Sequence, residues 1–314
     1  MRVLVTGGAG FIGSNLVDRL IEKGADVSVV DNLLTGFERN INPRAKFYKV
    51  DVRDRDRLRE IFESERPEYV HHLAAQMDVR RSVEEPTFDA ENNILGGLNV
   101  ITSSLESGVK KIIYASTGGA VYGEPQYLPV DERHPVNPIC QYGISKHTVE
   151  HYLYLYRYLY GLNYTVLRYP NVYGPRQNPK GEAGVNAIFI GMMLEGRTPT
   201  IFGDGKQLRD YVYVDDVVEA NLLAMEKGDG EIYNIGSGIG ISVNKIYSML
   251  SEILSFDKPP IYAPPRLGEI QKVYLDSSKA QGELGWKPRV NFEDGLRKTI
   301  AWFRSKGWSV GGKA

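Results

Sequence analysis

Short apolar runs alternate with amphipathic stretches along the first half of the chain. The apolar runs are rich in Val and Ile, whereas the stretches between them repeat an apolar residue every three or four positions. Continuous apolar runs are typical of strands that are buried on both faces, and the longer period is typical of helices. The alternation predicts an α/β fold, a doubly wound parallel sheet with helices on both faces. We expect strands near 2–6, 26–31, 47–50, 69–73, 111–116 and 163–169, and helices near 10–24, 54–65, 86–108 and 140–161.

The pattern changes after Asn171, where Gly and Pro cluster and shorter elements follow. We interpret residues 1–170 as the domain of the main sheet and residues 171–314 as mainly a smaller C-terminal lobe that closes over a ligand. A late strand near 231–235, within a segment near 214–240, is expected to return to the main sheet, so that the two lobes interleave. Further helices are expected near 185–196, 214–227, 242–255 and 292–305.

Composition and charge narrow the possible classes of protein. The 314 residues are 42% hydrophobic and 25% charged, with a net charge of -1 at pH 7. This charge balance gives no broad electrostatic field that would attract nucleic acid or a membrane surface. No apolar run is long enough to span a bilayer. The chain starts directly with a strand pattern, which leaves no room for a signal peptide. We therefore expect a cytoplasmic protein with no nucleic acid or membrane partner.

The residues that commonly bind metals are few. Cys140 is the only cysteine, which excludes an internal disulfide and a cysteine metal cluster. We expect His134, His147 and His151 to be scattered, and none of them has the spacing to a carboxylate that is typical of metal ligands. We predict no metal site.

A glycine-rich segment directly follows the first apolar run. Gly7, Gly10 and Gly13 lie between a predicted strand and a predicted helix whose first residues include Phe11 and Ile12. In this context glycines let the backbone approach a pyrophosphate, whose charge lies at the positive end of the helix. The spacing and its context predict a Rossmann-type dinucleotide site.

An acidic residue closes the second predicted strand. Asp31 follows the run Val27 to Val30. A carboxylate at this position binds the two ribose hydroxyls of adenosine and repels a 2′-phosphate. The sequence therefore favours NAD over NADP.

Tyr142 and Lys146 form a Tyr-x-x-x-Lys pair at the start of a predicted helix. Residues four apart lie on one helix face, and an ammonium beside a phenol lowers the pKa of the phenol. A phenolate is then a general base for a sugar or alcohol hydroxyl. Thr117 and Ser116, at the end of the fifth strand, place a hydroxyl near this pair. We expect these four residues to form the catalytic group.

The whole pattern resembles the extended short-chain dehydrogenase/reductase family, and within it the NAD-dependent epimerases and dehydratases, most closely the UDP-glucose (UDP-galactose) 4-epimerases. The resemblance runs from Met1 to about Trp308. The motifs that carry it are Thr6–Gly13, Asp31–Asn32, Asp51–Val52, His72–Ala75, Tyr142–Lys146, Arg168–Arg176, Phe202–Gly205 and Arg209–Asp215.

The resemblance implies an isomerase that inverts C4 of a UDP-hexose through a transient 4-keto sugar, with NAD as the cofactor. Tyr142 would act as the base, and Lys146 would bind the nicotinamide ribose. The implied cofactor-binding residues are Gly7, Gly10, Phe11, Ile12, Gly13, Asp31, Asn32, Asp51, Val52, Leu73, Ala74, Ala75, Gln76, Asn93, Tyr142, Lys146 and Tyr169. The implied UDP-sugar-binding residues are Asn171, Val185, Asn186, Arg209, Tyr211, Arg266 and Val273.

The chain departs from the family where epimerases show a serine-rich stretch. Gly118 aligns with the usual catalytic serine, so we assign the hydroxyl role to Thr117, with Ser116 second. The acids that related dehydratases and decarboxylases carry after the threonine are missing, because Gly118, Gly119 and Ala120 stand there. These differences favour epimerisation.

Other functions stay open. They are another sugar-nucleotide epimerase, dehydratase or decarboxylase, such as a UDP-glucuronate 4-epimerase, and a non-catalytic NAD-binding regulator. Val273 aligns with a position that helps set pocket size, and a small residue there leaves room for N-acetylated sugars. The family commonly dimerises through two helices, here near 86–108 and 140–161, so we expect a homodimer.

Overall fold

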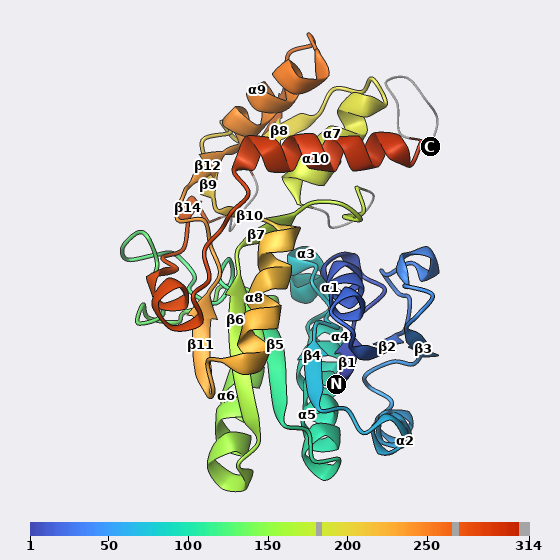
Figure 1. Ribbon diagram of the computed structural model, residues 1–314. Coiled ribbons are helices and arrows are strands. Elements are labelled where there is room, and N and C mark those ends of the chain that lie inside the picture. The colour runs from blue at the N-terminus through green and yellow to red at the C-terminus, as the bar shows by residue number, and fades with distance from the viewer. Residues whose placement is uncertain (180–183, 266–269, 308–314) are drawn as a thin grey trace.

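The computed structural model describes residues 1–179, 184–265 and 270–307. Its centre is a sheet of seven parallel strands in the order β11-β6-β5-β4-β1-β2-β3 (Figure 1). The order reverses between β1 and β4, which is where such sheets bind ligands. The Rossmann-type α/β class is confirmed. The strands are β1 (Arg2–Thr6), β2 (Asp26–Asp31), β3 (Lys46–Lys49), β4 (Tyr69–His72), β5 (Lys111–Thr117), β6 (Asn163–Tyr169) and β11 (Glu231–Asn234).

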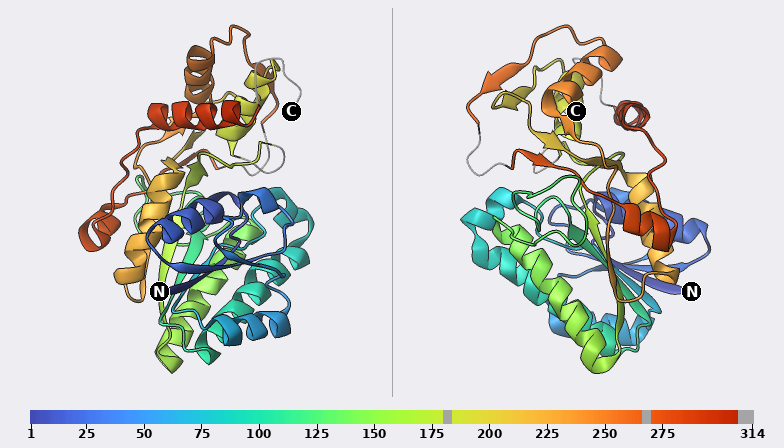
Figure 2. Two further views of the ribbon diagram at one scale, coloured as in Figure 1. Left: turned by 45° about the vertical axis from the view of Figure 1, so that its right-hand side comes forward. Right: turned by 90° about the vertical axis from the view of Figure 1, so that its left-hand side faces the viewer.

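Helices cover both faces of the sheet (Figure 2). Because neighbouring residues of a strand point to opposite faces, Val3 and Val5 pack in one core while Leu4 packs in the other. The first core includes α1 and α8; the second includes α2, α5 and α6. These helices are α1 (Phe11–Glu22), α2 (Arg55–Glu65), α5 (Gly96–Glu106), α6 (Gln141–Tyr160) and α8 (Val214–Glu226).

The helix expected near 86–108 is interrupted, which corrects the prediction. A short helix α4 (Pro86–Ala90) leads into a π turn, η2 (Glu91–Leu95), before α5 begins. An additional short helix, α3 (Val79–Glu84), was not predicted; Asp78 caps it by accepting from the backbone N–H groups of Arg80 and Arg81.

The later segments form a layer beyond the carboxyl ends of the main strands (Figure 1). Their apolar residues, such as Phe189 and Leu250, belong to the same core as Val3, so this layer is packed continuously with the sheet. β11 returns to the sheet beside β6. The division into two domains at residue 170 stays a prediction. The layer contains β7 (Asn171–Tyr173), α7 (Val185–Leu194), β8 (Thr200–Phe202), β9 (Leu208–Arg209), β10 (Tyr211–Tyr213), β12 (Ile241–Ser242), α9 (Val243–Leu254), β13 (Ile261–Ala263), β14 (Lys272–Val273) and α10 (Phe292–Ser305).

Two further short helical turns of the chain are η1 (Glu38–Asn40), which lies between β2 and β3, and η3 (Ala280–Leu284), which precedes α10.

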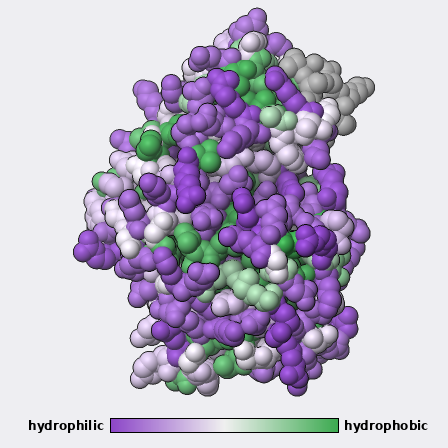
Figure 3. Space-filling view, viewed as in Figure 1, coloured by the Kyte–Doolittle hydropathy of each residue, from purple (hydrophilic) through white to green (hydrophobic). Residues whose placement is uncertain are grey.

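The surface is mainly polar on the face drawn in Figure 3, with hydrophobic residues in small groups. Among the helices in the described part of the chain, none is both long and apolar enough to cross a membrane.

Candidate active site

The glycine loop joins β1 to α1 and is packed so tightly that side chains are excluded. Gly7 has φ +72°, and a Cβ added there would lie 2.7 Å from the backbone nitrogen of Ala74. A Cβ at Gly13 would lie 2.2 Å from the carbonyl oxygen of Gly7. Gly10 is the N-cap of α1, and no side chain of the described residues caps this end. The first N–H groups of the helix, including those of Phe11 and Ile12, therefore suit the pyrophosphate of a dinucleotide.

Asp31 lies at the end of β2 beside this loop and is 8% exposed. Its carboxylate accepts from the backbone nitrogen of Ala9 at 3.0 Å and from that of Leu33 at 2.8 Å. Burial raises the pKa of Asp31, and the two backbone hydrogen bonds oppose that rise. The two bonds fix the orientation of the carboxylate that we expect at the adenosine ribose.

Asn32 and Asp51 interact directly, as neighbouring cofactor residues would. The Asn32 side chain donates to Asp51 at 2.8 Å, and Arg53 donates to both carboxylate oxygens of Asp51, at 3.0 and 2.9 Å. The hydrogen bond from Arg53 is the main reason why the pKa of Asp51 falls to about 2. Val52 is buried and packs closely against Gly96 of α5. Asp51 therefore holds a fixed negative charge beside Asn32, and Val52 is held in place by its packing against α5.

The segment after β4 is anchored by an asparagine of the π turn. Asn93 accepts from the backbone nitrogen of Gln76 at 2.8 Å and donates to the backbone oxygen of Gln76 at 2.9 Å. Its amide also donates to Asp89 and to Ser145 of α6. The segment Leu73–Gln76 is therefore tied both to the π turn and to the helix that carries Tyr142.

Tyr142 and Lys146 lie in the first two turns of α6, opposite the end of β5. The Thr117 hydroxyl lies near enough to the Tyr142 phenol to lower its pKa, against the effect of burial. Lys146 is 3% exposed, and its Nζ lies 4.3 Å from the centre of the Tyr114 ring. The structure thus brings together a phenol, a hydroxyl and a buried amine at one strand end.

The pKa shifts correct one sequence-based expectation. Burial raises the pKa of Tyr142, and Lys146 is not among the groups that act on it. Burial also lowers the pKa of Lys146 to about 7, against the charges of Glu150 and Asp89. The expected lowering of the Tyr142 pKa by Lys146 is therefore wrong for the protein alone, because removal from water disfavours the charged form of each side chain.

Ser116 and Thr117 have different partners. The Ser116 hydroxyl donates to Glu150 of α6 at 2.6 Å, whereas the Thr117 hydroxyl contacts Tyr142. Glu150 also accepts from Arg168 through two nitrogens, at 2.9 and 2.6 Å. Ser116 is therefore part of a buried ion-pair network, and Thr117 is the hydroxyl that lies at the phenol.

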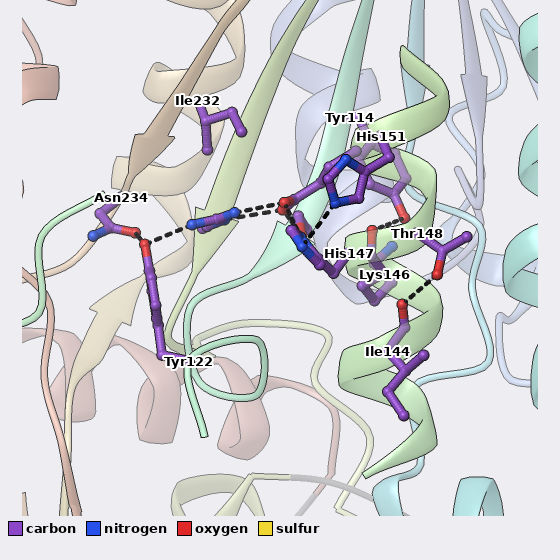
Figure 4. Close-up of polar contacts among 12 residues, drawn as sticks. Tyr114, Tyr122, Ile144, Lys146, His147, Thr148, His151, Ile232 and Asn234 are labelled. Carbon is purple, nitrogen blue, oxygen red and sulfur yellow. Dashed lines mark hydrogen bonds and ion pairs between the residues drawn. The ribbon is translucent and has the colours of Figure 1, made fainter. Parts of the chain in front are cut away.

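The network extends in both directions from Glu150, toward Tyr122 and Asn234 on one side and toward His147 on the other (Figure 4). On one side Arg168 donates to the Tyr122 hydroxyl at 2.9 Å, which donates to Asn234 at 2.8 Å. On the other side His147 Nδ1 lies within hydrogen-bond distance of Glu150, at 2.8 Å. The three-residue separation places both side chains on one face of α6.

On the sugar side, Asn186 is the most informative residue. It lies in the first turn of α7, it is 1% exposed, and its side-chain oxygen and nitrogen have no hydrogen-bond partner among the described residues. A buried amide without partners costs free energy, so Asn186 and the neighbouring Val185 suit a polar ligand.

The other expected sugar-side residues lie near one another in short strands. Asn171 in β7 donates through its side chain to the Asp210 backbone oxygen at 3.2 Å. Arg209 in β9 pairs with Val273 in β14, and the Val273 side chain is buried. Tyr211 is buried, with its ring 5.4 Å from that of Phe292. Arg266 lies outside the described residues.

Tyr169, expected at the cofactor, is buried at the end of β6. Its hydroxyl accepts from Asn221 of α8 at 2.7 Å, and its backbone oxygen accepts from Gly118 at 2.7 Å. Its side chain is thus anchored to α8.

Three buried charged residues of this region were not predicted. Glu150 and Arg168 form the ion pair described above, and Asp89 accepts from Gln76 and Asn93. For Glu150 the available signal was that it follows Lys146 by four residues, the same spacing as Tyr142 and Lys146. Arg168 opens one of the motifs that carry the family resemblance.

The fold and the glycine loop define a nucleotide-binding protein of the Rossmann class. The sequence pattern of the NAD dependent epimerase/dehydratase family matches residues 3–236, and the chain belongs to this family. Membership confirms the sequence resemblance and the choice of NAD as the cofactor.

Three comparisons locate the chain within the family. UDP-glucose 4-epimerase of Mycolicibacterium smegmatis is 43% identical over 98% of this chain and 99% of that protein. The structure of UDP-glucose 4-epimerase with UDP-glucose from Thermotoga maritima is 54% identical, with a TM-score of 0.97 over 98% of this chain and 99% of that chain. The structure of Thermus thermophilus UDP-glucose 4-epimerase with NAD is 45% identical, with a TM-score of 0.92 over 97% and 99%.

Proposed function

We propose that this protein is an NAD-dependent isomerase that interconverts UDP-glucose and UDP-galactose by inverting C4 of the sugar. The observation that carries the proposal is the contact between Thr117 and Tyr142 at the end of β5, with Lys146 one turn further along α6. Relatives that are called UDP-glucose 4-epimerases match nearly the whole chain, which supports the same reaction.

Tyr142, Thr117 and Lys146 have different roles in the proposed reaction. Tyr142 takes the proton of the sugar's 4-hydroxyl and later returns it, and Thr117 holds the phenol oxygen through its hydroxyl. Lys146 binds the nicotinamide ribose. When bound, NAD supplies the acceptor and donor of the C4 hydride, and its positively charged nicotinamide favours the phenolate form of Tyr142.

The cofactor is expected to stay bound, since the reaction has no net redox change. The glycine loop lies against the Ala74 backbone, and Asp31 is fixed by two backbone N–H groups. These rigid contacts reduce the entropy that is lost on binding, which favours tight retention.

The sugar nucleotide is held from the opposite side. The unpartnered amide of Asn186 provides one donor and one acceptor for the uracil, and Arg209 provides a cation for the diphosphate. The positions after Thr117 are Gly118, Gly119 and Ala120, which carry no acid for dehydration.

A panel experiment separates the candidate activities. The purified protein is incubated with UDP-glucose, UDP-galactose, UDP-glucuronate and UDP-N-acetylglucosamine, without added NAD, and the products are identified. We expect interconversion of the first two. Turnover of UDP-glucuronate alone would assign a different sugar, and binding of NAD without turnover of any sugar would indicate a regulator.

We also propose a homodimer through α5 and α6. A row of apolar side chains on α6 is 41–77% exposed, and Leu95 beside α5 is 54% exposed. Burying such a face against a second copy is favourable. We expect a dimer in analytical ultracentrifugation, and Tyr158→Lys should shift it toward monomer; a wild-type monomer would contradict the proposal. The residues of the row are Ile144, Tyr154, Leu155, Tyr158, Leu159 and Tyr160.

A further inference from the structure

Two histidines lie side by side on the outer face of α6, away from the proposed reacting groups. His147 and His151 are four residues apart, and their Nε2 atoms share a hydrogen bond at 3.0 Å. Their ring centres are 4.4 Å apart, with the planes inclined at 68°. His151 is exposed and the His147 side chain is 26% exposed, so solutes reach this pair in the single chain.

A buried carboxylate fixes the tautomer of the first imidazole. His147 Nδ1 lies 2.8 Å from Oε2 of Glu150, which is 3% exposed. Glu150 also accepts from Arg168 through both carboxylate oxygens, at 2.9 and 2.6 Å, and forms an ion pair with it. Since the carboxylate is ionised and only accepts, Nδ1 of His147 carries the proton. Nε2 of a neutral His147 therefore presents its lone pair toward His151.

This arrangement matches the requirements of a transition-metal ion. Two imidazole nitrogens bound side by side to one ion at about 2.1 Å each lie roughly 3.0–3.4 Å apart. Metal-bound histidines usually donate their other N–H to a carboxylate, which orients the ring and makes the ligand nitrogen more basic. Glu150 already supplies that contact, and Arg168 and Ser116 hold Glu150 in place.

We propose that His147 and His151 chelate one divalent transition-metal ion of the class that prefers imidazole, namely Zn²⁺, Ni²⁺ or Cu²⁺. The described residues contain no group of three or more His, Cys, Asp or Glu that could hold a metal ion, so the site is bidentate within one chain and water completes the coordination. The proposal is independent of the epimerase reaction. The pair lies on the helix that we assign to the dimer, so two pairs could share one ion across the interface.

Calorimetric titration of the purified, NAD-loaded protein with ZnCl₂ tests the site. We expect saturable binding at one ion per chain, or at one ion per two chains if the dimer brings two pairs together. His151→Gln and His147→Gln should each lower the affinity by at least the ~10-fold that loss of a supporting contact costs. Thr148→Ala, on the same helix turn, is the matched control and should bind like the wild type.

Two further results distinguish chelation from scattered binding. The double variant His147→Gln/His151→Gln should be little worse than either single variant, because losing one ligand already abolishes chelation. Affinity should also fall at acidic pH, since protonated imidazole does not bind metals. Equal binding by the wild type and His151→Gln, or no binding by the wild type, would overturn the proposal; circular dichroism confirms that each variant is folded.

Discussion

Gly118 lies directly against Leu275, one residue beyond the hydroxyl of Thr117 that we propose to act at Tyr142. A Cβ added at Gly118 would lie 2.4 Å from Cδ1 of Leu275 and 3.1 Å from its Cδ2. Leu275 is fully buried, and its backbone nitrogen donates to Asp210 at 3.1 Å, which limits its movement. A serine at position 118 would force Leu275 to shift, and glycine itself carries no hydroxyl, which supports the proposal that Thr117 supplies it.

The packing can be tested with a double-mutant cycle. Gly118→Ser should destabilise the protein by ~1–3 kcal/mol through overlap with Leu275. Leu275→Ala should cost ~2–5 kcal/mol through the cavity that it leaves. The double variant should be less destabilised than the sum of the two, because the serine then occupies the vacated space. Urea unfolding measures all three, and strict additivity would contradict the close contact.

Thr117→Val should lower kcat by ~10² or more, since it removes the hydroxyl at the proposed base. Thr117→Ser keeps a hydroxyl and serves as the control, with activity near that of the wild type. Ser116→Ala should reduce kcat less, because the Ser116 hydroxyl donates to Glu150 and not to Tyr142. If Ser116→Ala has the larger effect on kcat in a fully folded variant, the assignment of Thr117 is wrong.

Glu150 should make stability depend on pH in a defined direction. Its pKa is lowered from the ordinary 4.5 to about 2 in the folded chain, so its contribution is complete above about 4.5 and is lost as the pH falls toward 2. Glu150→Gln leaves the buried Arg168 without its charge partner and should cost ~3–5 kcal/mol at pH 7.

Urea unfolding of the wild type and Glu150→Gln between pH 7 and pH 2.5 measures this effect. The difference between the two proteins should shrink steadily below pH 4.5. A difference that stays constant over this range would show that Glu150 does not titrate as described.

Val273→Tyr should reduce turnover of UDP-N-acetylglucosamine more than turnover of UDP-glucose. Val273 is 3% exposed and packs with Val121, Val130 and Leu275, so a larger side chain must displace something next to the proposed sugar site. The ratio of kcat/KM for the two sugars, before and after the substitution, is the measurement. An unchanged ratio would mean that Val273 only fills the core.

The sequence predicted the main sheet well because its strands are buried on both faces. The run Val27 to Val30 is an example, since Val27 and Val29 lie in one core, Val30 lies in the other, and only Ser28 interrupts the apolar pattern. The interruption between α4 and α5 was not predictable from periodicity. It accompanies the bonds of Asn93 to Gln76 and Ser145, which are 17 and 52 residues away in the chain.

In the proposed active site, too, some residues could be predicted from the sequence and others could not. Gly7, Asp31 and Tyr142 could be named because each stands at a strand end or helix start, where local pattern indicates ligand binding. The pairing of Glu150 with Arg168 could not, because only the folded sheet brings α6 against β6. The pKa of Tyr142 was predicted in the wrong direction, because spacing along a helix gives no measure of burial.

The most direct test of the proposed reaction follows the hydrogen at sugar C4. UDP-galactose with deuterium at C4 is incubated with the purified protein in ordinary water without added NAD, and the product is analysed by NMR and mass spectrometry. We predict UDP-glucose that retains deuterium at C4, NAD released when the protein is denatured, and turnover slowed ~10²-fold or more in Tyr142→Phe. No epimerised product, loss of the deuterium to water, or equal turnover by Tyr142→Phe would contradict the account.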